Sequence, residues 1–542
     1  MDNSMPTGTY TMIPDSNNNN ADGKLVYYLT MADSCISYDV AYSPTSSFEG
    51  NTLSGTGSMT NQKIYEGIAT SLSTNAFTAP TGYYFAGWNT AQDGSGTAFD
   101  DEQQVTDLVA VGNTITLYAM WTDCPGEKIC YDGNGSTAGA MTNQSVTSYN
   151  TEGLIAYNYK RTNYGFLGWS TVKLDPDDND FSTDLTAALA ANKVYGPMEE
   201  ITMGNVDSGG LKLYAVWLPR STDYTMQTFT SSICNSTLSK VIFDSANDKF
   251  YTEGHSTLTS DSFIGLADTR NSNTVYAIGR LSDGNCWMLE NLRIGSGVSA
   301  STMASGSQGV GGNFTKLPTS VDTNWDTNLS NNVYTVNADT YTYNGDTYSS
   351  GMTLPQFNNN NTNIGGTNAS SDPLVASHTR SGADAQWYAY GNYYSWPAAK
   401  ANTSTTLTSA SASEAALTSI CPTNWRLPIG GESTATYSVG ALSISMGGLN
   451  TIMDQSTTPT GNTIGKRFTR LPNNFVYSGL YGSFGSSSSA TSRNSGAIYW
   501  TSTARSRVNA YAFVFYKNGG FHPGIGIHYR YYGEAVRCLA GS

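Results

Sequence analysis

The residues best suited to chemistry lie near the C-terminus of this 542-residue chain, and their chemistry is that of binding. Between residues 519 and 533, histidine, arginine and aromatic side chains stand among glycines without a hydrophobic period. Rings and guanidinium groups are enriched at the positions that dominate interface affinity. Because the stretch follows neither the helical nor the strand period, we expect an irregular, exposed segment rather than an ordinary strand or helix.

Catalytic and metal-binding arrangements are scarce. The chain has four histidines, and its sequence contains neither a G-x-S-x-G nor an H-E-x-x-H motif. His522 and His528 lack a nearby cysteine or carboxylate in the sequence, so we expect them to contact a ligand or solvent rather than a metal. We therefore expect no catalytic residue, no cofactor and no enzymatic activity.

A carboxylate cluster over residues 175–180, D-P-D-D-N-D, is the one segment with some potential for calcium. Calcium takes six or more oxygen ligands, and the segment lacks the glycine and the distal glutamate of an EF-hand. A solvated loop is the favoured interpretation, and calcium binding stays open as the alternative.

Composition and charge restrict the class of protein. The net charge is −15, which argues against nucleic acid as a partner because phosphate binding needs a basic face. Charged residues make up 13% of the chain and aromatic residues 12%, with 36 tyrosines, a mixture typical of short strands, polar loops and binding surfaces. The seven cysteines form no C-x-x-C pair and fit an oxidising compartment.

Targeting signals are not evident. The sequence has no apolar run of about 18 residues, so no membrane span is expected, and its start has neither a basic nor an apolar region. Either the protein is cytosolic or its export signal has been removed. We expect the second, and therefore a protein that is extracellular or at the cell surface.

Internal repetition is the clearest sequence signal. Four blocks recur in the same order with loop-length changes between them. Residues 115–120 alternate as a strand with one buried face would, and a tryptophan in each copy is expected to be core. The recurring pairs are 36–39 with 129–132, 59–62 with 141–144, 85–90 with 166–171, and 117–121 with 213–217.

These blocks resemble the Listeria–Bacteroides repeat, the B-repeat type of internalin-like surface proteins. The F-x-G-W-x-T and L-Y-A-x-W blocks carry the resemblance, which implies small β-grasp-like units serving as a stalk or adhesion module. We assign residues 34–122 to the first unit and 123–219 to the second. Residues 1–33 are interpreted as the remnant of a preceding repeat.

Residues 220–542 contain no repeat block. We assign them to one further domain with loops inserted over 296–385. Four segments rich in Trp and Cys indicate a compact core pinned by disulfides, and we expect the pairs Cys421–Cys538 and Cys234–Cys286. The four segments are 281–292, 391–396, 421–428 and 499–503 with 536–538.

The order C-W-M-x-E-N-L, C-P-x-x-W-R-L-P, W-T-S-T and V-R-C resembles the Fibrobacter-type paralogous domain. That family is related to the C-type lectin-like and formylglycine-generating-enzyme folds, so the resemblance implies a mixed α+β domain with long loops. The whole chain is thus expected to be multidomain, β-rich and α+β. The related enzymes use reactive cysteines, whereas Cys421 and Cys538 here fall in blocks expected to be bridged.

Residues 505–516 alternate as a strand does. Ala510, Ala512 and Val514 fall on one face, while Tyr511 and Phe513 fall with Phe515 on the other. One face is expected to be core, which would leave the other free for recognition.

Residues 499–538 also resemble the variable region of proteins diversified by retroelements, in which adenine-directed mutagenesis turns AAC codons into NNC codons. Such codons cannot encode Lys, Glu, Gln, Met or Trp. Between Arg505 and Tyr532 the one residue of these types is Lys517, and Glu534 follows nearby, so both would have to be encoded by the template. A fixed lectin-like surface remains the alternative.

We therefore expect a surface-displayed protein whose lectin-like C-terminal face binds a protein or a glycan. The ligand would lie on another cell or on a phage. The alternatives are an oxidoreductase of the formylglycine-generating type and a purely structural adhesin. The expected contact residues are Arg505, Arg507, Val508, Tyr516, Phe521, His522, Ile525, Ile527, His528, Tyr529, Tyr531 and Tyr532.

Overall fold

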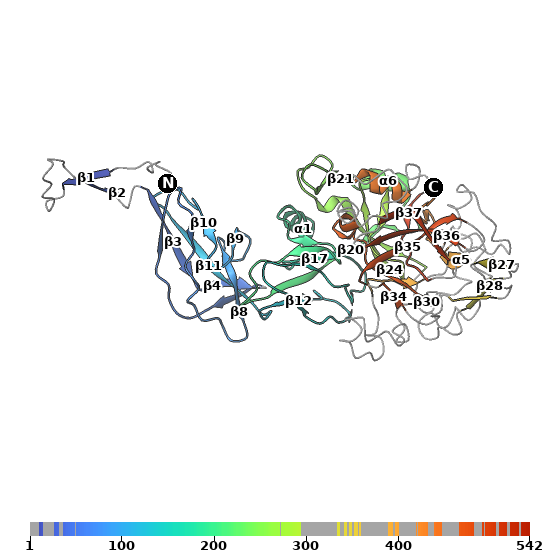
Figure 1. Ribbon diagram of the computed structural model, residues 1–542, viewed down its shortest axis with the longest axis horizontal. Helices are drawn as coiled ribbons and strands as arrows, with labels where there is room; N and C mark the ends of the chain where they lie inside the picture. The colour runs from blue at the N-terminus through green and yellow to red at the C-terminus, as the bar shows by residue number, and fades with distance from the viewer. Residues whose placement is uncertain are drawn as a thin grey trace. The chain divides into compact units, whose positions relative to one another are not determined.

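A computed structural model gives the fold, which is β-rich and multidomain with few helices and several sheets (Figure 1). By its contacts the chain divides into two compact units. Unit 1 comprises Met1–Cys130, Asn143–Glu152 and Thr202–Lys212, and unit 2 comprises Tyr131–Thr142, Gly153–Ile201 and Leu213–Ser542. The structure describes residues 10–14, 27–31, 36–48, 50–270, 273–293, 333–336, 341–343, 346–348, 352–355, 357–358, 388–393, 396–399, 419, 421–431, 438–446, 465–481, 490–492, 494–505, 509–517, 521–529 and 533–541.

The first repeat forms a five-stranded sheet in unit 1. Its order is β6 (Gln62–Tyr65), β3 (Ser37–Ser43), β11 (Thr114–Thr122), β8 (Tyr84–Asn89) and β9 (Ala98–Phe99). The pair β3–β11 is parallel, and the other pairs are antiparallel. The expected alternation is confirmed, because Leu117 and Ala119 are fully buried.

The expectation that the repeat tryptophans are core is also confirmed. Trp88 is fully buried, and its indole donates to Asp101, so the ring's one polar atom is satisfied. The glycine that precedes it has a reason of its own. A Cβ on Gly87 would lie 2.7 Å from the carbonyl oxygen of Phe99, so only glycine lets β9 approach β8 this closely.

The second repeat reproduces this local register. Strands β17 (Tyr164–Ser170) and β20 (Leu211–Thr225) pair antiparallel with Trp169 opposite Ala215, as Trp88 stands opposite Ala119 in the first repeat. Strand β18 (Val194–Tyr195) pairs with β17, and α1 (Phe181–Ala190) lies between them in sequence. Trp217 is buried and donates to the Gly133 carbonyl.

Strand β20 continues past Pro219, where the sequence changes character, so the sheet that holds β17 and β18 of the second repeat extends into the C-terminal segment. The order there is β20, β23 (Phe263–Asp268), β24 (Thr274–Arg280), β25 (Cys286–Met288), β38 (Leu539–Ala540) and β32 (Trp425–Arg426). A hairpin of β21 (Val241–Asp244) and β22 (Lys249–Thr252) stands apart from it. Of the segment 296–385, the structure describes the short strands β26 (Val333–Val336), β27 (Tyr341–Tyr343), β28 (Asp346–Tyr348), β29 (Met352–Pro355) and β30 (Phe357–Asn358).

The Trp- and Cys-rich segments converge as the sequence predicts. Trp287 of β25 stands opposite Leu539, and Trp425 of β32 stands opposite Ala540. Residues from all four segments contribute to one buried hydrophobic cluster, among them Trp396 of α5 (Trp396–Ala399) and Trp500. Side chains far apart in the chain thus share one core.

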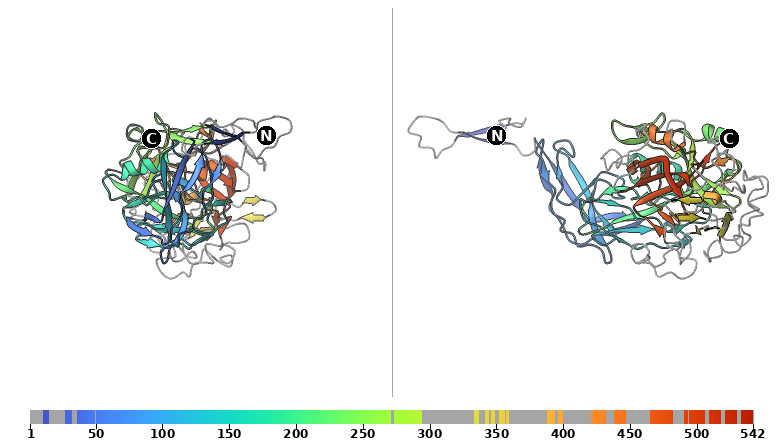
Figure 2. Two further views of the ribbon diagram at one scale, coloured as in Figure 1. Left: turned by 90° about the vertical axis from the view of Figure 1, so that its left-hand side faces the viewer. Right: turned by 45° about the vertical axis from the view of Figure 1, so that its right-hand side comes forward.

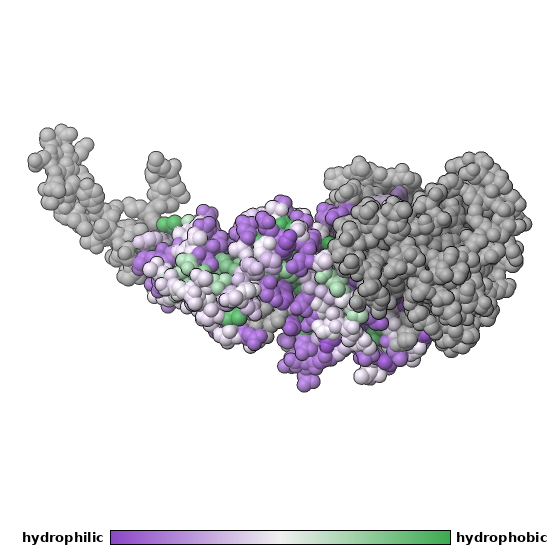
Figure 3. Space-filling model, turned by 90° about the horizontal axis from the view of Figure 1, so that it is seen from below, coloured by the Kyte–Doolittle hydropathy of each residue, from purple (hydrophilic) through white to green (hydrophobic). Residues whose placement is uncertain are grey.

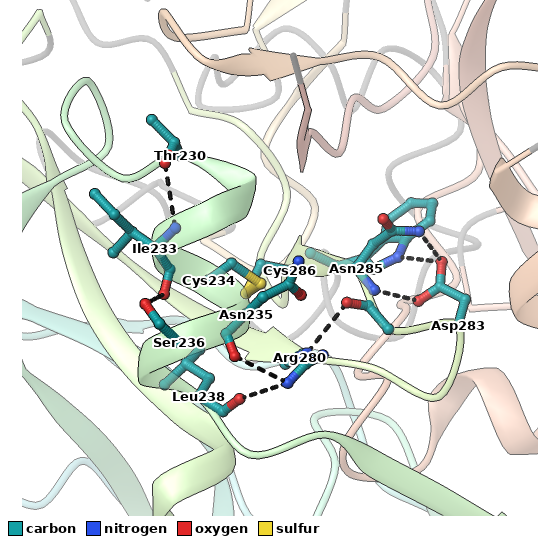
Figure 4. Close-up of a disulfide and its surroundings, with 12 residues drawn as sticks. Thr230, Ile233, Cys234, Asn235, Ser236, Leu238, Arg280, Asp283, Asn285 and Cys286 are labelled. Carbon is teal, nitrogen blue, oxygen red and sulfur yellow. Dashed lines mark hydrogen bonds between the residues drawn. A yellow bond between two sulfur atoms is a disulfide. The ribbon is translucent and has the colours of Figure 1, made fainter.

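Both predicted disulfides are present, Cys234–Cys286 and Cys421–Cys538. Figure 4 shows the first, which ties α2 (Ser231–Thr237) to β25 beside Arg280. The Arg280 guanidinium donates to the Gly284 and Leu238 carbonyls and so holds the loops on both sides of the bridge.

A third disulfide, Cys124–Cys130 in unit 1, was not foreseen from the sequence. Its cysteines are separated by six positions, a spacing that matches no common motif. The backbone between them turns at a residue with positive φ, Glu127, which brings the two strand ends together. The seventh cysteine, Cys35, lies outside the described residues.

The carboxylate of Glu290 joins two parts of unit 2 that are distant in sequence. Its Oε2 accepts hydrogen bonds from the Phe166 backbone of β17 (3.1 Å) and the Ala277 backbone of β24 (2.8 Å). Its Oε1 accepts from the Tyr157 hydroxyl and the Arg293 guanidinium, both at 2.9 Å. A buried carboxylate with four donors, one of them a cation, is fully satisfied.

We expect Glu290→Ala to lower the free energy of unfolding of unit 2 by about 3–5 kcal/mol, because removing one partner of a buried pair leaves Arg293 uncompensated. Urea unfolding followed by tryptophan fluorescence measures the change. Glu253→Ala, which removes an exposed carboxylate, is the matched control and should change stability by less than about 0.5 kcal/mol. Equal stability of the two variants would contradict this role of Glu290.

Candidate functional site

The C-terminal candidate residues belong to a three-stranded antiparallel sheet, drawn in red in Figures 1 and 2. Strand β36 (Asn509–Tyr516) lies between β35 (Gly496–Ala504) and β37 (Phe521–Tyr529). Strand β37 therefore forms one edge of the sheet within the described part of the chain.

The expectation of a free aromatic face on β36 is wrong, because both faces of the strand are buried. Ala510, Ala512 and Val514 join the hydrophobic cluster on one side. On the other side Phe513 is fully buried, with its ring 4.9 Å from that of Phe468 and 5.3 Å from that of Phe475. A segment over residues 468–477, which strand periodicity cannot reveal, supplies the second covering layer.

The expectation that residues 519–533 contain no ordinary strand is also wrong. Residues 521–529 pair with β36, and a bulge opposite Phe513 absorbs Pro523, Gly524 and Ile525. Pairing uses backbone groups, so a segment without hydrophobic alternation can join a sheet if its neighbour supplies the pattern. Gly526 fits the register because a Cβ there would lie 2.7 Å from Val514 and 3.0 Å from the Ala512 carbonyl.

The predicted contact residues separate by exposure. Ile527, opposite the buried Tyr511, has 46% of its surface exposed, and Arg505 at the end of β35 is exposed. Half-buried positions are Tyr516, His522 and His528. Phe521, Ile525 and Tyr529 belong to the backbone of β37. Four predicted residues lie outside the described residues: Arg507, Val508, Tyr531 and Tyr532.

A buried acid–base pair links β37 to the chain's last segment, and sequence reasoning missed it. The Nδ1 of His528 lies 2.5 Å from the Oε1 of Glu534, which is fully buried just before the A-V-R-C block. The Oε2 of Glu534 has no hydrogen-bond partner in the described part of the chain. A charged residue directly before a buried block was the available signal for such a pair.

The pair shifts both titrations. Burial lowers the pKa of His528, but the Glu534 carboxylate outweighs it, so the pKa is raised above its usual value. Burial raises the pKa of Glu534, and His528 offsets part of that rise. On the same side of the sheet, burial and the charge of His528 lower the pKa of His522. The ion pair therefore forms in a site that resists isolated charge.

Carboxylates of the 175–180 loop engage the protein itself. Asp177 binds the Arg161 guanidinium at 2.5 Å and also the Tyr164 hydroxyl. Asp175 accepts from the Asp177 backbone. Across the described ranges, no three His, Cys, Asp or Glu side chains gather as a metal site would require.

The described surface of the repeats is mostly hydrophilic. On the face drawn in Figure 3, hydrophobic residues form small separated spots. Single exposed apolar residues are usual on protein surfaces, so this face gives no sign of a broad apolar interface. Among the residues that have been placed, no helix has the length and hydrophobicity needed to cross a membrane.

Comparison with known proteins identifies the repeats. Residues 45–120 and 128–191 match the Listeria–Bacteroides repeat domain, so the chain carries two repeats of that type. A relative from Evansella cellulosilytica, described as a "Putative Gly-rich membrane protein", is 31% identical over 140 residues. The match covers 25% of this chain and only 14% of that protein. No solved structure matches the chain.

The repeats and the three disulfides are compatible with an extracellular or surface protein.

We expect the stability of unit 2 to fall as the pH rises from 6.5 to 8.5. The folded-state pKa of His528 is raised, so its contribution is complete below about 6.5 and is lost as the pH passes the folded value. The raised pKa of Glu534 has the same sign. Urea unfolding across this range gives the slope.

In the same measurement His528→Gln should change the slope, because it removes the titration of the histidine and also the charge that holds down the pKa of Glu534. His255→Gln, at an exposed histidine, should leave the slope unchanged. A wild-type slope retained in His528→Gln would show that the pair does not couple pH to folding.

Proposed function

We propose that this protein is a binding protein displayed on a bacterial surface, with the two repeats as its stalk and the edge formed by β37 as its recognition surface. The observation that carries the proposal is the position of β37. It is a strand with an exposed isoleucine, held against a sheet whose central strand is buried on both faces. A rigid support under a variable contact surface reduces the entropy cost of binding.

The fixed and variable positions divide in a way that supports retroelement diversification. Residues needed for the fold, such as Phe513 and Val536, are buried, whereas Ile527 and Arg505 are exposed. A variable protein of a diversity-generating retroelement, built on a C-type lectin-like scaffold, would need this division. It would keep Glu534 fixed, and Glu534 is fully buried against His528.

The proposed ligand is a protein or a glycan. Helix α6 (Ser438–Ser445) packs beside β37 and exposes Ile444, so two apolar side chains are available on neighbouring elements. Apolar contact combined with the half-buried His522 and His528 suits shape-based recognition with few hydrogen bonds. The name of the Evansella relative is consistent with attachment to a membrane.

The proposal assigns no enzymatic activity. An oxidoreductase of the formylglycine-generating type would need reactive thiols, and six of the seven cysteines stand in disulfides. We expect thiol titration of the denatured, unreduced protein to give one thiol per chain. Three or more thiols would favour the oxidoreductase instead.

Binding is tested with a glycan array and a phage-displayed peptide library as probes of the labelled full chain. We expect Ile527→Arg to reduce binding of a retained glycan or peptide at least tenfold, because the charge disrupts an apolar contact. Ile68→Arg is the matched control, since Ile68 in unit 1 is 44% exposed, and it should bind as the wild type does. Equal binding by both variants, or no ligand retained, argues for the structural adhesin.

Diversification is tested by the DNA that flanks the gene. We expect a reverse-transcriptase gene and a near-copy of the segment that encodes residues 499–538, with differences confined to adenines. If both are absent, the surface is a fixed one.

A further inference from the structure

A cleft of about 450 Å³ opens in unit 2, on elements that the proposed function does not use. Its walls come from the end of α1, from β18 and the turn that follows it, from the β21–β22 hairpin, and from residues 256–258 and 470–471. Segments from the second repeat and from the C-terminal part of unit 2 therefore enclose it together.

The floor of the cleft depends on a close backbone contact. A Cβ on Gly196 would lie 2.4 Å from the Thr469 carbonyl oxygen and 2.8 Å from the Leu471 nitrogen, so only glycine permits this approach. This contact brings the backbone N–H groups of Gly196 and Leu471 to the carboxylate of Glu199. The Oε2 of Glu199 accepts from Gly196 (2.7 Å) and from Leu471 (3.3 Å). These bonds fix the Glu199 side chain in the wall of the cleft.

The other carboxylates around the cleft are already engaged. Asp248 binds Arg467 and Arg470, each at 2.8 Å. Glu200 binds Lys466 at 2.7 Å.

Asp244 accepts from the Ala246 and Asn247 backbones and stands opposite Lys249 in the hairpin. Within the described residues, Glu199 makes no ion pair within 4.0 Å, and its Oε1 accepts no hydrogen bond.

The environment of Glu199 penalises its charge. Burial raises the pKa of this carboxyl to about 7, although the two backbone donors and the more distant Arg470 lower it. Burial and the Glu199 charge also raise the pKa of Tyr195, so the tyrosine lies close enough to sense that charge. A cation that entered the cleft would relieve this penalty.

Aromatic rings complete the lining. Tyr195, Phe250 and Tyr251 all contribute to the walls. Rings of this kind attract cations through their faces, and they also cover the apolar side of a sugar or an alkyl chain. One uncommitted carboxylate among three aromatic residues suits a ligand with a single positive charge and an apolar body.

We propose that this cleft binds a primary ammonium group, paired with Glu199 beside the aromatic residues of the lining. The group could come from an amino sugar or from a lysine side chain of a peptide, which share this chemistry. The site is independent of β37, so it would give the protein a second ligand contact.

The test is calorimetric titration of the full chain with three probes: Nα-acetyl-lysine methylamide, whose side-chain amine is free, glucosamine and glucose. We expect at least one amine to bind and glucose, which lacks the ammonium group, to bind at least tenfold more weakly. Preference for glucosamine identifies the sugar source, and preference for the lysine compound identifies the peptide source.

Two variants and a control complete the design. Glu199→Gln keeps an acceptor for the two N–H groups and should reduce amine binding at least tenfold without loss of folding. Leu258→Trp should fill the cleft and abolish binding. Glu253→Gln removes an exposed carboxylate elsewhere and should bind as the wild type does.

Binding of the lysine compound should strengthen about tenfold from pH 6 to pH 8, because the competent form carries an ionised Glu199. The probe's own amine stays charged over this range. The other charged or titratable groups that line the cleft are Tyr195, Glu200, Asp244, Asp248, Lys249, Tyr251 and Arg470.

Failure of both amines to bind at millimolar concentration would overturn the proposal, and so would glucose binding equal to glucosamine. Undiminished amine binding by a folded Glu199→Gln variant would also overturn it. None of these results bears on β37, because Ile527→Arg leaves the cleft intact.

Discussion

A buried carboxylate must be given donors, and in unit 2 this requirement is met by parts of the chain that lie far apart in sequence. Glu290 takes backbone donors from β17 of the second repeat and from β24 of the C-terminal segment. A Cβ on Gly165 would lie 2.3 Å from the Ala277 nitrogen, so the two strands approach as closely as the carboxylate demands. By contacts, most of the second repeat (residues 131–142, 153–201 and 213–219) falls in the same compact unit as the C-terminal segment.

The same principle governs the layer beneath the proposed recognition strand. Arg537 is buried, and its guanidinium donates to the Asn291 side chain and to the carbonyls of Asn473 and Asn474. The guanidinium also lies 4.3 Å from the centre of the Phe475 ring, which packs on Phe513 of β36. Burial lowers the pKa of Arg537, yet the three acceptors and the ring compensate for the lost water.

These two arrangements place the stability of this region in buried groups rather than in the exposed Ile527 of the edge strand β37. The central strand of the sheet that carries β37 is covered on both faces, and Cys421 and Cys538, which are bridged, belong to the same buried cluster as its residue Ala512. A substitution at the exposed Ile527 should therefore cost little folding stability. The proposed ammonium cleft differs from these two buried sites in how its carboxylate is neutralised. There, among the described residues, Glu199 has two backbone donors and the more distant charge of Arg470 but no ion pair within 4.0 Å.

The sequence by itself determined the repeats, their tryptophan cores and the two disulfides of the C-terminal segment. Each of these depends on residues whose types recur locally, such as Gly87 before Trp88, or on cysteines embedded in apolar blocks. The tertiary structure alone decided that Phe513 is covered, that residues 521–529 join a sheet and that His528 meets Glu534. Each of those outcomes depends on a partner far away in the chain or on backbone pairing. Neither leaves a periodic signal in the segment itself.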